Sequence, residues 1–368
     1  MIQKENTARE EAYIQAILKI CEQEKIDTIF PSFDAQVYVF SKNKERCEKR
    51  GVIIPVPDYE VVITPLDKYR TIQAAEEVGF PCPRTYLPET EEDLRCIANE
   101  LGFPLIIKRR FTAGGRGMHL IRDLSDLLDK AGNGGDDFGT FVMQEYIPGG
   151  RTNNFAITLD KKGELKMVFC RKVLDHSRRG CQVFAVDSPV SQPYALHAAR
   201  MAQDLGWWGG ITIQTCIDSR DNTPKLMELN PRIGVGLWNR TEAGINEPLT
   251  ILKIARGEEI EPIRDYPVGV VFVDPVQHSV RLSQAFADLL IFRFRTGILG
   301  KEPVDRSNSP MSLKEMVPWV GKTYFSGRRL IWSPYTKYFF QDPIVSIIWW
   351  IQFIARWWIQ NRPRDLGQ

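Results

Sequence analysis

Hydrophobic and polar positions follow two different periods along the chain, which predicts a mixture of helices and strands. Residues 8–25 place apolar side chains at i, i+3, i+4 and i+7 from Ile14, as in an amphipathic helix. The apolar runs 26–31 and 49–57 predict two short strands. A strand–helix–strand order of this kind indicates a parallel α/β sheet near the amino terminus.

The same two periods continue as far as residue 231. Further helices are predicted over residues 67–78, 91–101 and 191–205. Further strands are predicted over residues 103–110, 140–150, 154–160, 165–173, 209–218 and 223–231. Turn residues between neighbouring strands predict two β-hairpins, one over 154–173 and one over 209–231.

The stretch LMELNPRIG, residues 226–234, places three polar side chains at two-residue intervals. Glu228, Asn230 and Arg232 should therefore project from one face of a strand, about 7 Å apart. Gln214 precedes them on the other strand of the hairpin and can oppose Glu228 and Asn230. Carboxylate and amide oxygens suit Mg²⁺, and a guanidinium suits a phosphate or a carboxylate. The alternative is the polar outer face of an ordinary hairpin.

A glycine-rich segment, TAGGRG, follows the predicted strand that ends near Lys108. Its residues Gly114, Gly115 and Gly117 would let backbone N–H groups approach a phosphate, and Lys108 would supply countercharge. The segment is not a P-loop, because no GKS or GKT follows it. Taken alone, it could equally be a plain hairpin turn.

Composition narrows the class of protein. The 368 residues predict two or three domains. With 48 basic and 46 acidic residues and no long run of like charge, the chain gives no reason to expect a nucleic-acid partner. The 7 cysteines are scattered without a CxxC pair, which predicts reduced thiols. The charged amino terminus lacks the apolar core of a signal peptide, so we expect a cytoplasmic protein.

Four segments in order resemble an ATP-grasp ligase. They are TPLDKYRTIQAAEEVGFPCPRTY, LGFPLIIKRRFTAGGRGM, VMQEYIPGG and GGITIQTCID…KLMELNPR, and the resemblance covers about residues 25–255. It is greatest to the synthetase domain of the carbamoyl phosphate synthetase large chain, with biotin carboxylase next. The resemblance implies a mixed α/β and α+β fold in which ATP lies between two lobes under a glycine-rich flap. It also implies that a carboxylate is phosphorylated to an acyl phosphate, which an amine or other nucleophile then attacks.

The resemblance implies roles for nucleotide-binding residues. Lys68 and Lys108 match the two basic positions that contact the ATP phosphates, and the three glycines of the loop belong to the flap. The segment that holds adenine by backbone groups and a carboxylate contains Gln144, Glu145 and Ile147. In TNNF, residues 152–155, the chain departs from the family, which often has an acidic residue there to meet the ribose hydroxyls.

The resemblance also implies a metal site and a catalytic residue. Gln214, Glu228 and Asn230 match the positions that bind Mg²⁺ or Mn²⁺, and the glutamine is the carbamoyl phosphate synthetase version. Arg232 matches the arginine that steadies the acyl phosphate or its attack, a role that fits the clamping of developing negative charge.

The chain is expected to divide into four parts. The first is a partial α/β domain that lacks the strand and glycine turn with which it usually opens, so we expect either a truncated first lobe or an upstream extension. The four parts are residues 1–66 for this partial domain, 67–255 for the ATP-grasp domain (flap lobe about 67–145, metal-binding lobe about 146–255), 256–340 for an extension of unassigned role and 341–368 for an apolar, tryptophan-rich helix.

The carboxyl-terminal helix has a narrow polar stripe. Between Ile344 and Gln360, the side chains of Gln352, Arg356 and Gln360 fall on one face, and four tryptophans lie elsewhere. As a helix these residues span about 25 Å, which is short for a bilayer crossing. The pattern favours a helix lying in the membrane surface. Docking on the ligase body or on a second subunit, and a true membrane span, are the alternatives.

We therefore predict an ATP- and Mg²⁺-dependent ligase that activates a small-molecule carboxylate as an acyl phosphate for capture by an amine or similar nucleophile. A homodimer and a peripheral contact with the inner membrane face through residues 344–360 are additional hypotheses. The competing interpretation is a non-catalytic ATP-binding protein that acts as a membrane-associated regulator. The metal-ligand pattern favours the enzyme, whereas the missing amino-terminal strand favours the binding protein.

Overall fold

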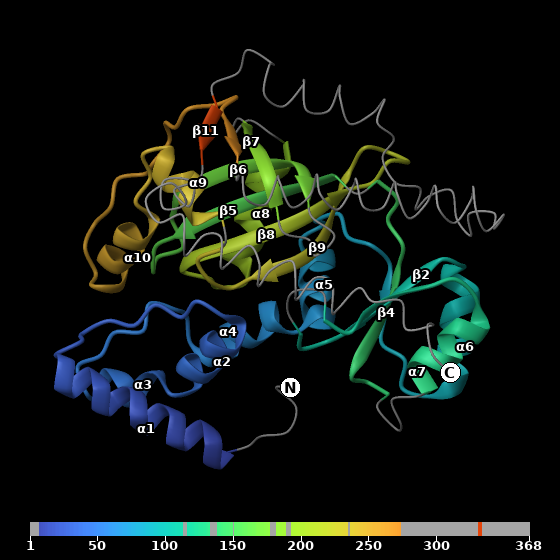
Figure 1. Cartoon of the computed structure of the whole chain (residues 1–368), viewed down its shortest axis with the longest axis horizontal. Helices are drawn as coiled ribbons and strands as arrows, with labels where there is room; N and C mark the ends of the chain where they lie inside the picture. Colours follow the sequence, from blue (N-terminus) through green and yellow to red (C-terminus); the bar gives the residue numbers. More distant parts are fainter. Residues whose placement is uncertain are drawn as a thin grey trace, which may run out of the picture.

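The chain folds into two sheets with helices packed against them (Figure 1). The sheets have the strand orders β1-β4-β2-β3 and β11-β10-β7-β6-β5-β8-β9, and every pair is antiparallel except β10–β11. This computed structural model describes residues 7–112, 116–132, 138–149, 151–176, 182–188, 193–234, 236–273 and 330–332.

The four-stranded sheet and its two helices form a small lobe with its own hydrophobic core. Its strands and helices are β1 (Thr85–Tyr86), α6 (Glu91–Leu101), β2 (Leu105–Arg109), β3 (Met118–Ile121), α7 (Leu124–Gly132) and β4 (Phe141–Glu145). The core contains Leu94 and Ala98 of α6 packed with Leu105 and Ile107 of β2. A capping box between Thr90 and Asp93 fixes the start of α6, which has the bounds that its sequence period predicts.

The seven-stranded sheet forms a large lobe. Its elements are β5 (Arg151–Leu159), β6 (Leu165–His176), β7 (Gln182–Ser188), α8 (Pro193–Asp204), β8 (Gly209–Ile217), β9 (Pro224–Asn230), α9 (Leu237–Glu242), α10 (Glu247–Ala255), β10 (Val271–Val273) and β11 (Leu330–Trp332). Helix α8 packs on β5 and β6, and α10 packs on β8. Both predicted hairpins form, as β5–β6 and β8–β9.

Among the described residues, five helices precede the small lobe. They are α1 (Thr7–Glu24), α2 (Asp34–Lys42), α3 (Lys44–Glu48), α4 (Tyr59–Leu66) and α5 (Lys68–Glu77). The two strands predicted between them pair only through a single parallel bridge, Thr28 with Ile53. Pro31 and Pro55 lie close to this bridge, and because proline has no N–H to donate, the ladder cannot extend past either residue. The predicted parallel pairing therefore exists, but the two full-length strands do not form.

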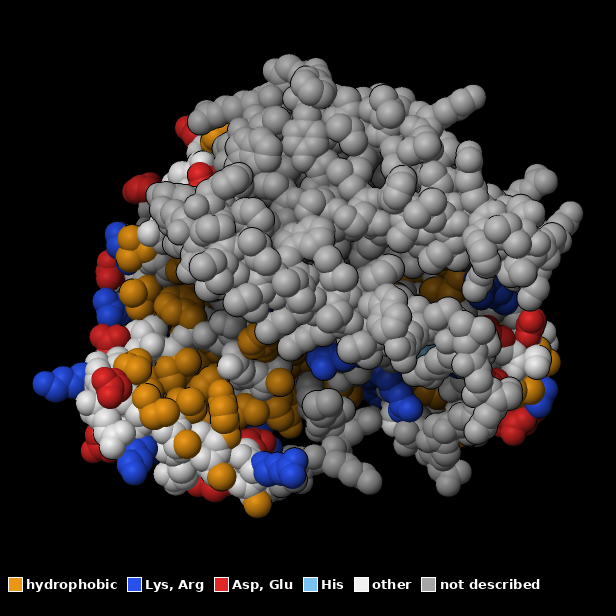
Figure 2. All heavy atoms as spheres, viewed as in Figure 1, with side chains coloured by type: hydrophobic (Ala, Val, Ile, Leu, Met, Phe, Trp, Pro, Cys, Tyr) orange, Lys and Arg blue, Asp and Glu red, His pale blue; other side chains and the backbone are white. Residues whose placement is uncertain are grey.

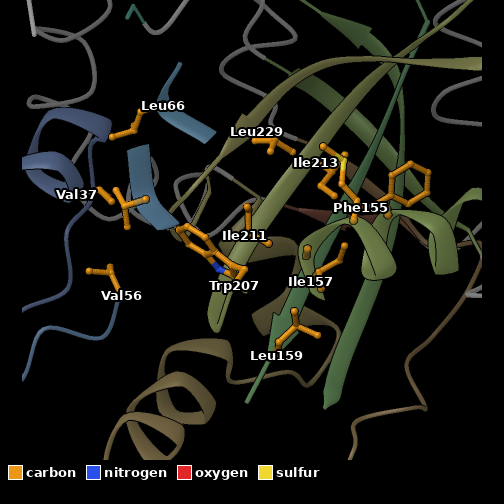
Figure 3. Packing of buried hydrophobic residues seen from close by; sticks show 14 of the residues in the cluster. Val37, Val56, Leu66, Phe155, Ile157, Leu159, Trp207, Ile211, Ile213 and Leu229 are labelled. Atoms are coloured by element: carbon orange, nitrogen blue, oxygen red, sulfur yellow. The ribbon is translucent and has the colours of Figure 1, made fainter. Parts of the chain in front are cut away.

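One hydrophobic core joins these helices to the large lobe. Trp207, which is 2% exposed, lies between Val37 and Leu66 of the helices and Ile211 and Leu229 of the sheet (Figure 3). Helices α4 and α5 both pack on β9. The amino-terminal helices are therefore fixed to the strand that carries the predicted metal ligands.

Helix α5 and strands β10 and β11 lie at the boundaries of the predicted lobes. Helix α5 falls in the segment assigned to the flap lobe, yet its Ile72 and Ala75 belong to the core shared by the amino-terminal helices and the large lobe. The large lobe also continues beyond residue 255, because β10 and β11 extend its sheet. An amphipathic pattern shows that a helix is buried on one face, but it does not show against which sheet.

The predicted apolar helix over residues 341–368, with its segment 344–360, lies outside the described residues. Among the helices that the structure describes, none combines the length and the apolar character that a membrane crossing requires.

Candidate functional site

The predicted metal ligands lie together on one face of the large sheet. Gln214 pairs directly with Glu228 across β8 and β9, and Thr212 pairs with Asn230. Leu229 belongs to the shared core, so its neighbours Glu228 and Asn230 project from the other face of β9. The Asn230 side-chain amide donates to Oε1 of Glu228 at 3.2 Å. The structure thus brings the three residues together, as the hairpin predicted.

A row of polar residues extends from these ligands across two more strands. Asn154 of β5 pairs with Gln214, and Arg171 of β6 pairs with Asn154. Directly paired residues of antiparallel strands point to the same face, so all four side chains of the row lie on the face that carries Glu228. Arg171 is buried, and its guanidinium donates to Oδ1 of Asn239 on α9. Sequence periodicity did not identify Arg171 as a site residue, because its position simply fits the regular alternation of side chains along β6.

Lys108 reaches this region from the small lobe. It lies on β2, is 5% exposed, and donates from Nζ to Oε1 of Gln144 at 2.6 Å. Gln144 in turn donates to the hydroxyl of Thr85 at 2.8 Å. Burial lowers the pKa of Lys108 to about 8, although the negative charge of Glu228 opposes the shift. The charge of Glu228, on the large lobe, thus acts on a lysine of the small lobe.

Lys68 is the first residue of α5 and lies at the base of the glycine-rich segment. Its Nζ donates to the carbonyl oxygen of Thr112 and, at 3.4 Å, to that of Arg110. Burial lowers the pKa of Lys68, and the nearby charges of Glu228 and Asp34 oppose that shift. Both predicted phosphate-binding lysines are therefore close to the same carboxylate, Glu228.

Two residues that the sequence reasoning missed hold Lys68 in place. Asp67 caps α5 by accepting from the backbone N–H of Tyr69 at 3.0 Å, and its carboxylate is 1% exposed. Arg110 donates from Nε to Asp67 at 3.0 Å and from Nη1 to the carbonyl of Gly139 at 2.8 Å. An aspartate directly before a helix is a recognisable capping signal, but nothing in the sequence pairs it with Arg110.

Arg232 connects the metal-ligand row to the amino-terminal helices. Its Nη2 donates to Oδ1 of Asn230 at 3.0 Å. Its Nε donates to Oδ1 of Asp34, the first residue of α2, at 2.7 Å. Sequence reasoning missed Asp34, because the two residues are 198 positions apart and no local pattern relates them.

Of the three predicted flap glycines, the structure describes Gly117. Its φ of +68° lies in the left-handed region, and a Cβ there would meet Cγ of Arg109 at 2.7 Å. Both observations require glycine at the base of β3. Gly114 and Gly115 lie outside the described residues.

The residues predicted to hold adenine lie at the end of β4 and just beyond it. The Gln144 side chain is turned toward Lys108. The carboxylate of Glu145 accepts from the backbone N–H of Arg84 at 3.3 Å and pairs with Arg220 at 2.7 Å. Ile147 is buried. The carboxylate of Glu145 thus has partners within the protein.

The predicted metal ligands suit a cation that is also coordinated by the phosphates of a bound substrate. Among the described residues, no three or more His, Cys, Asp or Glu side chains gather into a metal site. The predicted set instead combines one carboxylate, Glu228, with two side-chain amides. Mg²⁺ is commonly bound through one or two carboxylates together with substrate phosphates, which matches this set. Figure 2 shows Lys and Arg side chains gathered between the amino-terminal helices and the small lobe, where such phosphates would need countercharge.

Family models match two parts of the chain. The model described as the carbamoyl-phosphate synthase L chain, ATP binding domain, matches residues 67–263, which is just over half of the chain. A model described as the PylC-like N-terminal domain matches residues 6–55.

Two relatives with similar sequences are longer than this chain. The carbamoyl phosphate synthase large chain of Pyrococcus furiosus is 24% identical over 274 residues, which cover 69% of this chain and 25% of that protein. The pyruvate carboxylase of Bacillus subtilis is 26% identical over 242 residues, which cover 60% of this chain and 20% of that protein. The chain therefore spans a quarter or less of the length of these relatives.

Solved biotin carboxylases share the fold. The enzyme from Campylobacter jejuni matches with a TM-score of 0.61 and 22% identity, over 70% of this chain and 60% of that one. The biotin carboxylase domain of the Hydrogenobacter thermophilus 2-oxoglutarate carboxylase, solved as a dimer with MgADP, ADP and bicarbonate, matches with a TM-score of 0.58 and 20% identity, over 68% and 59%. The likeness shows a mixed α/β, biotin carboxylase-like fold with antiparallel sheets.

Proposed function

The chain belongs to the family of the carbamoyl-phosphate synthase L chain, ATP-binding domain, and on that premise we propose that it is an ATP- and Mg²⁺-dependent ligase. It activates a small-molecule carboxylate as an acyl phosphate, which an amine or similar nucleophile then attacks. One observation carries the proposal: the charge of Glu228, which pairs with Gln214 on the metal-ligand row, acts on both Lys68 and Lys108, from different parts of the chain.

The metal-ligand row and the lysines have different roles in holding the nucleotide: the row binds the metal, and the lysines bind the phosphates. Gln214, Glu228 and Asn230 hold Mg²⁺ or Mn²⁺ through one carboxylate and two amide oxygens. MgATP supplies the phosphoryl group that is transferred. Lys68 and Lys108 offset the negative charge of the phosphates, and Lys108 does so from a buried position where electrostatic attraction is stronger than in water.

Arg232 is the catalytic residue in this proposal. Its guanidinium already bonds to Asn230, so it lies beside the place where the metal and the phosphoryl group would meet. A guanidinium can contact two oxygens of a phosphate or carboxylate at once. Arg232 would therefore stabilise the negative charge that develops as the acyl phosphate forms.

The rest of the nucleotide is assigned to the small lobe and the strand that leaves it. Gly114, Gly115 and Gly117 cover the phosphates through backbone N–H groups. The base packs against Ile147 and bonds to the backbone near Gln144 and Glu145. Because the Hydrogenobacter relative was solved as a dimer, we include a homodimer in the proposal.

The test is ADP release by the purified full-length chain with ATP and Mg²⁺, screened against pools of carboxylates and of amino acids. We expect ADP when one carboxylate pool is present and faster release when an amine pool is added. ATP binding without ADP release in any combination of pools would contradict the ligase.

A non-catalytic nucleotide-binding protein is the second candidate. The ion pair between Arg232 and Asp34 favours it, because a catalytic arginine that stays paired with an aspartate cannot clamp a substrate. Under this alternative, MgATP raises the melting temperature but no carboxylate stimulates ADP release. The ADP screen combined with a thermal shift therefore separates the two candidates.

A further inference from the structure

We propose that Asp34 holds the attacking amine as an ammonium ion, so that the second substrate of this ligase is a primary amine. The inference rests on the proposed function and names the class of its nucleophile. The observation behind it is that Asp34, on helix α2, forms an ion pair with Arg232, the proposed catalytic residue.

The ion pair between Asp34 and Arg232 lies at the edge of the site. Its Nε–Oδ1 distance is 2.7 Å, and the side chains of Arg232 and Asp34 are 17% and 19% exposed. Arg232 also bonds to Asn230 at 3.0 Å. A continuous chain of polar contacts thus runs from α2 to the metal-ligand row.

The position of Asp34 is fixed by the fold. It is the first residue of α2, whose Val37 and Phe40 are buried in the core shared with the large lobe. The turn before the helix is held by a hydrogen bond from the backbone N–H of Ser32 to Oε1 of Gln36 at 2.9 Å. Since α2 and the metal-bearing strand β9 share one core, the distance from Asp34 to the row is set by packing.

Asp34 needs a new cationic partner when the acyl phosphate forms. Arg232 is then drawn to the phosphate and carboxylate oxygens, which weakens its bond to Asp34. A partly buried carboxylate that loses its partner is destabilised. Lys68 lies nearby, but its Nζ already donates to the carbonyl oxygens of Arg110 and Thr112. An ammonium group of the incoming substrate would restore the charge pair.

The arrangement also separates the two substrates in space. Lys108, on the small lobe, marks the side from which the ATP phosphates are held. Asp34 belongs to the amino-terminal helices and approaches Arg232 from another element. An amine held by Asp34 would therefore reach the acyl carbon without displacing the nucleotide.

In the coupling step, the amine nitrogen replaces the phosphate on the acyl carbon. The nitrogen forms a bond to the acyl carbon, and the bond from that carbon to the phosphate oxygen breaks. Two protons leave the ammonium nitrogen: one ends on the released phosphate as HPO₄²⁻, and the other passes through the Asp34 carboxylate to solvent. No oxidant or further reactant is required.

The experiment compares a charged and an uncharged nucleophile. Full-length protein is given MgATP, the carboxylate pool that stimulates ADP release, and either the mixture of protein amino acids or hydroxylamine, which is uncharged at neutral pH. Amide and hydroxamate are measured for wild type, Asp34→Asn, Asp34→Ser and Asp34→Glu. Asp58→Asn is the control, because Asp58 likewise lies at the start of an amino-terminal helix, as the residue before α4, but it is exposed and pairs with Lys44.

We expect Asp34→Asn and Asp34→Ser to lower the ratio of amide to hydroxamate by about tenfold or more, through a higher KM for the amine. Asp34→Glu, which keeps the charge, should retain more of the ratio, and Asp58→Asn should keep all of it. An unchanged ratio in the folded neutral variants, even with both rates reduced, would overturn the role of Asp34. Wild-type protein that forms no hydroxamate would instead contradict the proposed function, and the inference would fall with it.

Discussion

Glu228 supplies the one carboxylate of the proposed metal-ligand set, so its charge should decide whether MgATP is bound productively. We expect Glu228→Gln to lower ADP release by about 100-fold or more while the fold persists, because Glu228 does not belong to the hydrophobic core. Glu77→Gln, at the exposed end of α5, is the control. Both are measured by ADP release beside a melting curve. A folded Glu228→Gln protein with wild-type turnover would refute the metal assignment.

Without nucleotide, the buried charge of Lys108 should lower the free energy of unfolding. Bound MgATP should offset this loss. The pKa of Lys108 falls from 10.5 to about 8, which shows that the fold disfavours the ammonium form. Lys108→Met should therefore raise the free energy of unfolding by about 1–3 kcal/mol, and MgATP should stabilise this variant less than it stabilises the wild type. Urea unfolding with and without MgATP measures both effects. A less stable Lys108→Met protein would show that the lysine is structural.

The same residue predicts a dependence on pH. Between about 8 and 10.5 the unfolded chain keeps the Lys108 proton and the folded chain does not, so this group makes the free energy of unfolding rise with pH across that window. MgATP needs the charged form, so its affinity should fall as pH rises through about 8. Titrations of MgATP from pH 7 to pH 9.5 test this, with Lys108→Met as the control that lacks the dependence. A flat wild-type profile would argue against contact between Lys108 and the phosphates.

At the scale of elements, the connection from β4 to β5 is unusually tight. Gly149 has a φ of +142°, and a Cβ there would lie 2.2 Å from the carbonyl oxygen of Ile217 on β8. We expect Gly149→Ala to destabilise the protein by about 2–4 kcal/mol. Gly163→Ala, in the β5–β6 turn, is the matched control, because its φ is +80° but no atom lies within 4 Å of its Cβ. Equal losses from the two variants, measured by urea unfolding, would show that the close approach is unimportant.

The sequence predicted best those elements whose boundaries are marked by nearby residues, such as a helix cap or a short turn. Helix α6 begins at its capping box and has the predicted bounds. The β8–β9 hairpin places Gln214 opposite Glu228, because a short turn between alternating strands fixes which residues pair. The two full-length strands predicted around Thr28 and Ile53 do not form. Their apolar character indicated strands, but the nearby prolines have no N–H to donate and limit the pairing to one bridge.

At the scale of the molecule, the shared core should make the amino-terminal helices and the large lobe one cooperative unit. Trp207 lies in that core, so Trp207→Ala should cost about 3–5 kcal/mol and Trp207→Phe less. Hydrogen exchange should show α2 and β8 losing protection together, while β2 of the small lobe, which has its own core, changes less. Loss of protection in β8 alone would show that the helices form a separate unit.

Contacts between distant parts of the chain were beyond sequence reasoning. The pairing of Asp34 with Arg232 and that of Asp67 with Arg110 join segments whose local patterns are complete without each other. The packing of α5 on β9 was missed for the same reason, since an amphipathic helix does not specify its partner. The motifs predicted which residues form the proposed site, whereas the groups that orient those residues emerged only from the three-dimensional fold.

If the chain activates a carboxylate as an acyl phosphate, an oxygen of that carboxylate becomes bonded to the phosphorus that ATP donates. The most direct test is to supply the stimulating carboxylate with ¹⁸O in its carboxyl group, together with MgATP and the amine, and to analyse the released phosphate by mass spectrometry. We expect one ¹⁸O atom to move from the carboxylate to inorganic phosphate for each amide formed. Amide or ADP formation with unlabelled phosphate would contradict it, because ATP would then be consumed without a bond between the carboxylate and the phosphoryl group.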